Sequence, residues 1–227
     1  MADSALKIEK LIVGLGNPGE EYAATRHNLG WTALDAFLSE LGIKKNFTGG
    51  NKKARVQAVE VNHKGVLLVK PTTFMNLSGT AVKPFLNKLD LSTSDLLVVH
   101  DDMDFPPGRA KMRIGGGGGG HKGILSLIEH CGEDFTRLKI GIGRPENFME
   151  DNDIDWVLGK PSGSELEIID AIMPLVASGM RLWVEQGPER SMTSFNTAIR
   201  EIFSAVDEPM QGQSESGPDP KGEGPDG

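Results

Sequence analysis

Short apolar segments alternate with amphipathic segments along most of the chain, and this alternation limits it to a layered α/β fold. Residues 9–15 (EKLIVGL) predict a short buried strand that ends in a glycine turn. Apolar residues spaced i, i+3, i+4 and i+7 then predict a helix that starts near Asn28 and is ended by Gly42. Such alternation favours one mainly parallel sheet with helices on both faces.

A hairpin interrupts this alternation and makes the predicted sheet mixed. Residues 54–61 and 64–69 are short, rich in β-branched residues, and flank Asn62 and His63. The pattern predicts further strands over residues 95–100, 110–114 and 137–142, and helices over residues 77–89, 122–131, 162–186 and 189–203.

The composition changes at the end of the chain. Gly, Pro and Ser make up 11 of the 20 residues at positions 208–227, which carry five acidic residues and one basic residue. Such a segment cannot bury enough apolar surface to offset the entropy lost on ordering. We therefore expect a single domain over residues 1–203 and a disordered acidic tail over residues 208–227.

The charge of the chain argues against an extended nucleic-acid-binding surface. The 24 Lys and Arg residues are outnumbered by 32 Asp and Glu residues, which gives a net charge of −8. Residues 109–144 differ, with seven basic and three acidic residues, and favour a small contact with phosphate groups. No apolar run approaches the roughly 18–20 residues of a membrane span, the N-terminus lacks an export pattern, and Cys131 is the only cysteine. We expect a cytoplasmic monomer with no membrane partner.

Two glycine-rich segments predict turns and not nucleotide sites. Residues 14–19 (GLGNPG) match the dinucleotide fingerprint G-x-G-x-x-G, but two glutamates follow where a helix should face a pyrophosphate. The acidic residue expected about 20 positions later is also missing. Residues 115–120 are six glycines that lead into His121-Lys122, not into the Lys-Ser or Lys-Thr of a P-loop. We expect a mobile lid there, or a close approach of RNA backbone.

Polar residues cluster where predicted strands end. Residues 26–28 (RHN), 72–76 (TTFMN) and 100–104 (HDDMD) each follow such a strand. The carboxyl ends of parallel strands form the edge of an open sheet where ligands bind. A metal site formed by His100 and the three aspartates is an alternative, but no second histidine stands at ligand spacing.

These segments also hold the groups needed for hydrolysis without a covalent intermediate. No serine or cysteine occupies a strand-to-helix elbow. A histidine could activate water, an aspartate could orient that histidine, and asparagine side chains could stabilise an oxyanion.

In this order, the segments resemble bacterial-type peptidyl-tRNA hydrolases over about residues 8–203. The resemblance implies hydrolysis of the ester that joins a peptide to the 3′ terminal ribose of tRNA, which recycles the tRNA. It also implies no cofactor and no metal, and a partner, peptidyl-tRNA, bound through its acceptor stem and CCA end. The matching strings are LIVGLGNPG (11–19), YAATRHNLG (22–30), KPTTFMNLSG (70–79), HDDMDFPPG (100–108), the glycine run with His121, RLKIGIGRP (137–145) and VLGKP (157–161).

The resemblance implies a role for individual residues. His27 would be the general base, Asp101 would hold its tautomer, and Asn17 would position the peptide amide. The residues that would contact the substrate are Tyr22, Asn28, Phe74, Asn76, His121 and Lys122, and those that would contact tRNA phosphates are Arg113 and Lys139.

Two residues depart from the family pattern Gly-His-Gly-Gly-His-Asn-Gly, since Gly118 replaces the first His and Lys122 replaces the Asn. Lysine can donate to a phosphate or a carbonyl but cannot accept, so we expect altered contacts with the tRNA end and not a loss of activity. Two other functions are alternatives. A non-catalytic RNA-binding relative would not need His27 and Asp101 in an open cleft, and a nicotinamide-dependent oxidoreductase would need nucleotide bound at residues 14–19.

Overall fold

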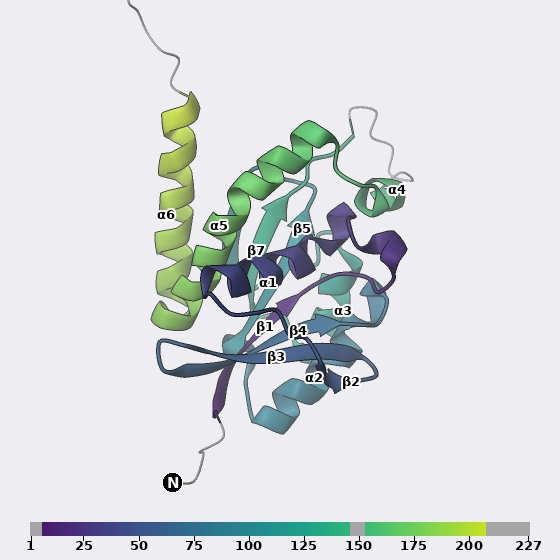
Figure 1. Ribbon diagram of the computed structural model, residues 1–227, viewed down its shortest axis with the longest axis vertical. Helices are drawn as coiled ribbons and strands as arrows, with labels where there is room; N and C mark the ends of the chain where they lie inside the picture. Colours follow the sequence, from purple (N-terminus) through teal and green to yellow (C-terminus); the bar gives the residue numbers. More distant parts are fainter. Residues whose placement is uncertain (1–5, 146–152, 208–227) are drawn as a thin grey trace, which may run out of the picture.

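The computed structural model describes residues 6–145 and 153–207, and its centre is one seven-stranded sheet (Figure 1). The strand order is β2-β3-β4-β1-β5-β7-β6. The four central strands β4, β1, β5 and β7 run parallel, and both edges are antiparallel. The predicted α/β fold with a mixed sheet is therefore confirmed. The strands span Ile8–Gly14 (β1), Gly49–Asn51 (β2), Ala54–Val61 (β3), Lys64–Pro71 (β4), Leu96–Asp102 (β5), Ala110–Ile114 (β6) and Thr136–Gly141 (β7).

Helices cover both faces of the sheet, as predicted. α1 and α5 pack on one face with α6 beside them, whereas α2 and α3 pack on the other (Figure 1). Side chains along β1 alternate between the two cores: Ile12 faces α1 and α5, while Leu11 and Val13 face α2 and α3. No described helix is both long enough and apolar enough to cross a bilayer. The helices span Leu29–Glu40 (α1), Ser78–Leu89 (α2), Lys122–Cys131 (α3), Asp153–Leu158 (α4), Gly163–Gln186 (α5) and Pro188–Asp207 (α6).

Three features differ from the sequence expectation. The edge strand β2 was not predicted, because its three residues, Gly-Gly-Asn, carry no apolar pattern. The helix α4 has only six residues and was also missed. Helix α6 extends to Asp207, beyond the expected end at residue 203. The predicted tail, residues 208–227, lies outside the described residues.

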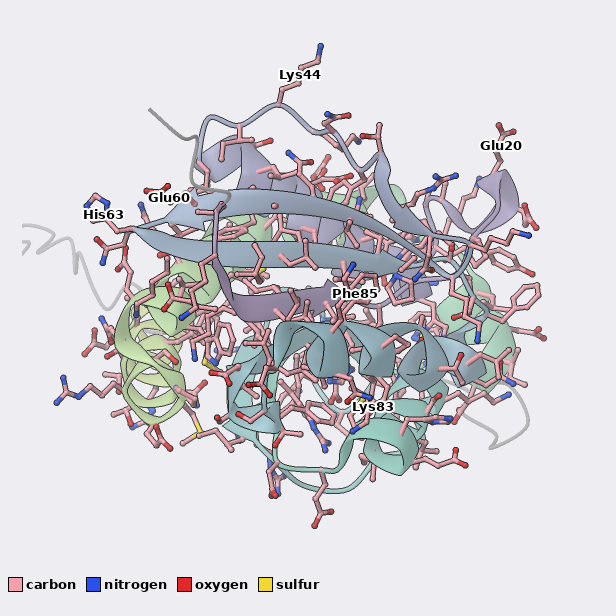
Figure 2. All side chains as sticks on the ribbon, turned by 90° about the horizontal axis from the view of Figure 1, so that it is seen from below. Glu20, Lys44, Glu60, His63, Lys83 and Phe85 are labelled. Atoms are coloured by element: carbon pink, nitrogen blue, oxygen red, sulfur yellow. The ribbon has the colours of Figure 1, made fainter. Side chains whose placement is uncertain are left out.

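The hairpin between β3 and β4 turns at Asn62 and His63, as predicted. Their φ angles are 48° and 63°, in the left-handed region that a tight two-residue hairpin turn uses. The His63 side chain is 95% exposed and points away from the body of the protein (Figure 2). It lies on the opposite side of the molecule from Glu20, which follows the glycine turn after β1 (Figure 2).

The sheet brings the predicted polar segments to one edge. The glycine turn follows β1, the short 3-10 helix η3 (Met75–Leu77) follows β4, and β5 ends in its two aspartates. A second 3-10 helix, η2 (Arg26–Asn28), precedes α1 and contacts β5 and α4. Since the carboxyl ends of β1, β4, β5 and β7 point the same way, their following segments surround one site.

Candidate active site

A cleft of about 330 Å³ lies at this edge of the sheet. Its walls come from the turn after β1, from η2 and η3, from the ends of β5 and β7, from the glycine run before α3, and from α4. Asn28 and Arg113 are predicted site residues that do not line it. The predicted site residues that do line it are Asn17, Tyr22, His27, Phe74, Asn76, Asp101, His121, Lys122 and Lys139.

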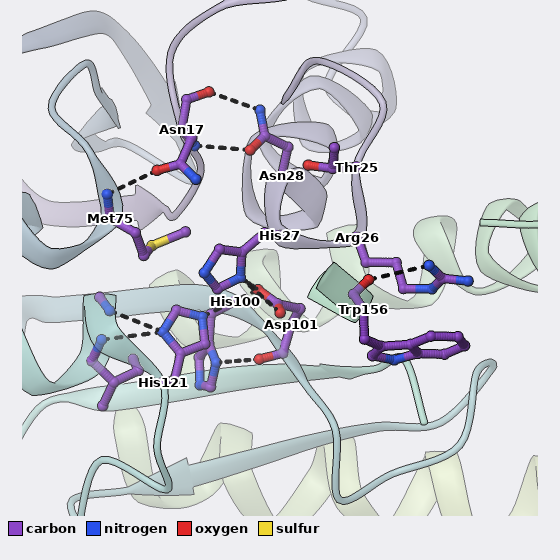
Figure 3. A network of polar contacts seen from close by, with 12 residues as sticks. Asn17, Thr25, Arg26, His27, Asn28, Met75, His100, Asp101, His121 and Trp156 are labelled. Atoms are coloured by element: carbon purple, nitrogen blue, oxygen red, sulfur yellow. Dashed lines mark hydrogen bonds and ion pairs between the residues drawn. The ribbon is translucent and has the colours of Figure 1, made fainter. Parts of the chain in front are cut away.

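His27 and Asp101 form the polar centre of the cleft (Figure 3). The Nδ1 atom of His27 lies 3.0 Å from each carboxylate oxygen of Asp101. An ionised carboxylate can only accept, so Nδ1 carries the proton and Nε2 carries the lone pair. No described residue forms a hydrogen bond with this Nε2 atom, which leaves it available to a water molecule in the cleft.

The Asp101 carboxylate is bound by a second imidazole, that of His121. The Nε2 atom of His121 lies 3.1 Å from Asp101 Oδ1. Burial alone would raise the pKa of Asp101, but the neighbouring His27 and His121 hold it well below its usual range. Asp101 is therefore ionised at neutral pH, although its residue is only 2% exposed.

His121 also begins helix α3 as its N-cap residue. Its Nδ1 atom accepts hydrogen bonds from the backbone N–H groups of Gly123 at 3.1 Å and Ile124 at 3.3 Å. Both ring nitrogens of His121 are thus engaged within the protein. Only the face of the His121 ring is therefore available for the predicted contact with the substrate.

A third imidazole, that of His100, lies beneath the other two. Its Nδ1 atom donates to the backbone carbonyl of Asp101 at 2.6 Å, while its Nε2 atom is buried without a partner among the described residues. Its ring meets that of His121 edge-on, with 4.8 Å between the centroids. Burial lowers the pKa of His100 well below its usual value, so this ring is neutral.

The cluster of His27, Asp101 and His121 has the residue types of a metal site, and its ligand atoms lie within 4.8 Å of one another. A metal would need the lone pair of His121 on Nε2. The two backbone donors at Nδ1 place the lone pair on Nδ1 and the proton on Nε2. The donor set therefore fits a hydrogen-bonded network better than a metal site, and a metal-free reaction stays a prediction.

Asn17 is fixed on three sides beside this network (Figure 3). Its backbone N–H donates to Asn28 Oδ1 at 2.8 Å, and its backbone carbonyl accepts from Asn28 Nδ2 at 3.0 Å. Its side-chain Oδ1 accepts from the backbone N–H of Met75 at 2.8 Å. The Nδ2 group of Asn17 is left as a donor without a partner among the described residues. Asn28, which is 1% exposed, supports Asn17 from behind the cleft.

Tyr22, Phe74 and Asn76 line the outer part of the cleft. Phe74 is 58% exposed, although large apolar side chains are usually buried. Asn76 is also exposed, and its carboxamide forms no hydrogen bond with a described residue. An exposed aromatic ring beside a free carboxamide suits contact with an unstacked base and a polar chain.

Basic residues of β7 and β6 lie on the side of the glycine run. Lys139 lines the cleft and pairs with Asp102 at 2.6 Å. Arg137, which sequence reasoning did not single out, donates to two carbonyls of the glycine run, those of Gly116 and Gly117. Arg113 is the register partner of Arg137 on β6, and it is exposed outside the cleft.

A second charge pair, which the sequence did not predict, adjoins His27. The Nε and Nη2 atoms of Arg26 each lie 2.6 Å from a carboxylate oxygen of Glu165, which belongs to α5. The guanidinium group stacks on Trp156 of α4 at 3.7 Å from the ring centroid (Figure 3). The one sequence signal was an arginine beside the predicted base, and its partner stands 139 positions away.

The glycines of residues 14–19 serve close packing. A Cβ atom on Gly14 would lie 2.2 Å from the carbonyl oxygen of Gly30, and one on Gly16 would lie 2.8 Å from the Trp31 ring. After Gly19 the chain enters a 3-10 helix of three residues, not an α-helix. The segment therefore lacks the helix N-terminus that a pyrophosphate needs, which argues against the oxidoreductase alternative.

The α/β fold and the imidazole–carboxylate pair in the cleft fit one class of protein, the hydrolases. Among the described residues that line the cleft there is no serine or cysteine to act as a nucleophile. The particular family follows from comparison with known proteins.

The chain belongs to the peptidyl-tRNA hydrolase family, whose sequence profile matches residues 11–202. It is 46% identical over 188 residues to the peptidyl-tRNA hydrolase of Syntrophomonas wolfei subsp. wolfei, covering 82% of this chain and 100% of that protein. It is 41% identical over 190 residues to that of Desulforamulus reducens, covering 82% and 88%. The crystal structure of peptidyl-tRNA hydrolase from Acinetobacter baumannii superposes with a TM-score of 0.75 at 34% identity, over 85% of this chain and 97% of that one.

Proposed function

We propose that this protein hydrolyses the ester bond of peptidyl-tRNA, which releases the peptide and returns the tRNA for use. The observation that carries the proposal is the His27–Asp101 pair in an open cleft, with the Nε2 atom of His27 free of protein partners. A protein that only binds RNA does not need a base held in this way. Membership of the family supports the same substrate class.

In the proposed mechanism, His27 acts as base and then as acid. Nε2 takes a proton from a water molecule, and the water oxygen attacks the ester carbonyl carbon to give a tetrahedral oxyanion. Asp101 accepts the Nδ1–H bond throughout and stabilises the imidazolium that forms. When the oxyanion collapses, the ester bond breaks and the 3′ oxygen of the ribose leaves with the proton from Nε2.

Two carboxamides are proposed to hold the peptide side of the substrate. Asn17 presents a free Nδ2 donor because its Oδ1 is bound to Met75. A carbonyl of the blocked amino group can accept from this donor, whereas the charged amine of an aminoacyl-tRNA offers no acceptor. Asn76 has an unbound carboxamide in the same cleft and is proposed to bind the substrate end or the oxyanion.

The tRNA end is proposed to follow the aromatic and basic side of the cleft. Phe74 and Tyr22 can contact the terminal bases, and Lys122 and Lys139 can contact phosphates. Arg113 lies outside the cleft, so we propose that it contacts the acceptor stem beyond the CCA end. The protein is proposed to work as a monomer in the cytoplasm.

The test is release of an N-acetylated amino acid from tRNA by the wild-type protein and by His27→Ala and Asp101→Ala. His27→Ala should lower the rate by a factor of about 10²–10⁴, which is the usual contribution of a general base. Asp101→Ala should lose less and should change the pH–rate profile, because the base stays but its tautomer is no longer fixed. Equal rates for all three proteins would contradict the mechanism.

The same assay separates the alternative of a non-catalytic RNA-binding relative. That alternative predicts no release above background by the wild-type protein, together with tRNA binding that His27→Ala leaves unchanged. The enzyme predicts release that His27→Ala abolishes while tRNA binding remains.

A further inference from the structure

We propose that His121 is a positioning residue: its Nε2–H group holds the Asp101 carboxylate against His27, and the start of helix α3 sets its tautomer. The inference rests on the proposed hydrolysis but concerns a different atom pair. The Nε2 atom of His121 lies 3.1 Å from Asp101 Oδ1, one of the two oxygens that accept from His27.

The tautomer follows from the first turn of α3. Two backbone N–H groups, those of Gly123 and Ile124, point at the Nδ1 atom of His121. A proton on Nδ1 would face both donors, so the ring proton belongs on Nε2. The helix thus converts an imidazole, which could carry its proton on either nitrogen, into a donor aimed at one carboxylate oxygen.

These contacts explain how the Asp101 carboxylate is held in position beside His27. The carboxylate accepts from His27 on one side and from His121 on the other, and its burial leaves it no water shell. Without His121, the Asp101 carboxylate could rotate about its side-chain torsions. Its negative charge would then be bound by one hydrogen-bond donor fewer. The two imidazole rings also contact each other directly, with 4.8 Å between their centroids, so His121 packs against His27 as well as holding its carboxylate.

A change at His121 reaches one other titratable group, the buried His100, whose pKa is lowered first by burial and then by the neighbouring His121. Lys139 is already paired with Asp102 at 2.6 Å, and the buried His100 ring is neutral. The charged and titratable groups that line the cleft around the cluster are Tyr22, His100, Asp102, Asp104, Lys122, Arg137, Lys139, Arg144 and Asp153.

Two substitutions separate the two bonds of His121. In His121→Asn the amide oxygen can replace Nδ1 as helix cap, but no group replaces Nε2. In His121→Gln the amide nitrogen can reach the position of Nε2, but the cap is lost. We expect His121→Asn to keep the thermal stability and to lose about 10- to 100-fold in kcat/KM, the range for a hydrogen bond to a charged group. We expect His121→Gln to lose stability and to keep most of the activity.

The pH–rate profile and the NMR spectra of the histidines distinguish a positioning role of His121 from a purely structural one. In His121→Asn the freed carboxylate charge stabilises the His27 imidazolium more strongly, so the acid limb of kcat/KM should move to higher pH. His121→Gln should keep the acid limb of the wild-type profile.

Nitrogen-15 spectra of the wild-type protein should show His121 with its proton on Nε2 and His27 with its proton on Nδ1. The proposal is overturned if His121 carries its proton on Nδ1, or if both variants shift the limb equally or not at all. Failure of the proposed function would instead appear as no hydrolysis by the wild-type protein, whatever the spectra show.

Discussion

Two carboxylates, the buried Asp101 and the half-buried Glu165, lie beside the η2 turn, and each is bound by one of two consecutive residues. Glu165 accepts two bonds of 2.6 Å from Arg26, and Asp101 accepts bonds of 3.0 Å from His27 and 3.1 Å from His121. In both cases burial would raise the pKa of the carboxyl group, and the bound partners lower it instead.

The two pairs differ in what the partner of the carboxylate can do. A guanidinium group stays protonated in a protein, so the Arg26–Glu165 pair has one state. It connects η2 to α4 and α5 and can only hold them in place. An imidazole with a free lone pair can take up a proton and release it again, so the His27–Asp101 pair has two states. Of the two carboxylates, Asp101 alone has a partner that can exchange a proton with the cleft.

The largest loss of stability should come from breaking the Arg26–Glu165 pair, in which the arginine stays protonated. Glu165→Gln leaves the Arg26 guanidinium buried without its counterion. We expect it to destabilise the fold by about 3 kcal/mol, at the low end for buried pairs because the Glu165 side chain keeps 12% exposure. Urea unfolding at pH 7 measures this. The pair lowers the pKa of Glu165, so its contribution is present above about pH 4.3 and is lost as the pH falls. The variant should therefore lose less stability than wild type on acidification.

A double variant tests whether that pair has any part in the reaction. Arg26→Met with Glu165→Met replaces both charges by apolar side chains of similar length, a change that is often neutral for stability. We expect it to recover most of the lost stability and to keep kcat within about threefold, which is under 1 kcal/mol. A double variant as stable as wild type but without activity would remove the distinction between the two pairs.

The sequence predicted the chemical pair and missed the structural one, for a physical reason. Asp101 lies at the carboxyl end of β5 and His27 in a turn after β1, so topology places them at one edge of the sheet, and the resemblance to a family supplied their roles. Arg26 and Glu165 meet through the packing of α5 against α1, which no local pattern records.

The same limit applies to the roles predicted for Asn28 and His121. The carboxamide of Asn28 is used by the backbone of Asn17, and the ring nitrogens of His121 are used by Asp101 and α3. Residue type and position predicted that both lie near the site. Which atoms remain free depends on contacts that only the folded chain makes.

A smaller effect is expected at Asn28, which supports the site without reaching the cleft. Asn28→Ala leaves the backbone N–H and carbonyl of Asn17 buried without partners, which costs about 1–3 kcal/mol for such groups. Asn17 should then lose its fixed position, and kcat/KM should fall by roughly tenfold. Asn28→Asp separates the two bonds, since its carboxylate can still accept from the N–H group of Asn17 but cannot donate to its carbonyl. If the alanine variant matched wild type in both unfolding and kinetics, Asn28 would have no supporting role.

The smallest effect should come from Lys122, a charge without a buried partner. It is the first residue of α3 and is exposed, and a cation there opposes the positive end of the helix dipole by roughly 0.3–1 kcal/mol. Lys122→Asn should therefore stabilise the fold slightly. If Lys122 contacts a tRNA phosphate, the same variant should raise KM about two- to fivefold at low salt and leave kcat unchanged.

Because the expected change in KM is small, the dependence of KM on salt concentration is the sharper test of whether Lys122 contacts a phosphate. Loss of one phosphate contact should reduce the slope of log KM against log salt by about 0.7–0.9. Lys88, a lysine in the last turn of α2 that does not line the cleft, provides the control: Lys88→Asn should leave KM and its salt slope unchanged. A Lys122→Asn variant with the wild-type KM and slope would show that this lysine only replaces the family's asparagine at the surface, and that the charge beside His121 takes no part in holding the tRNA end.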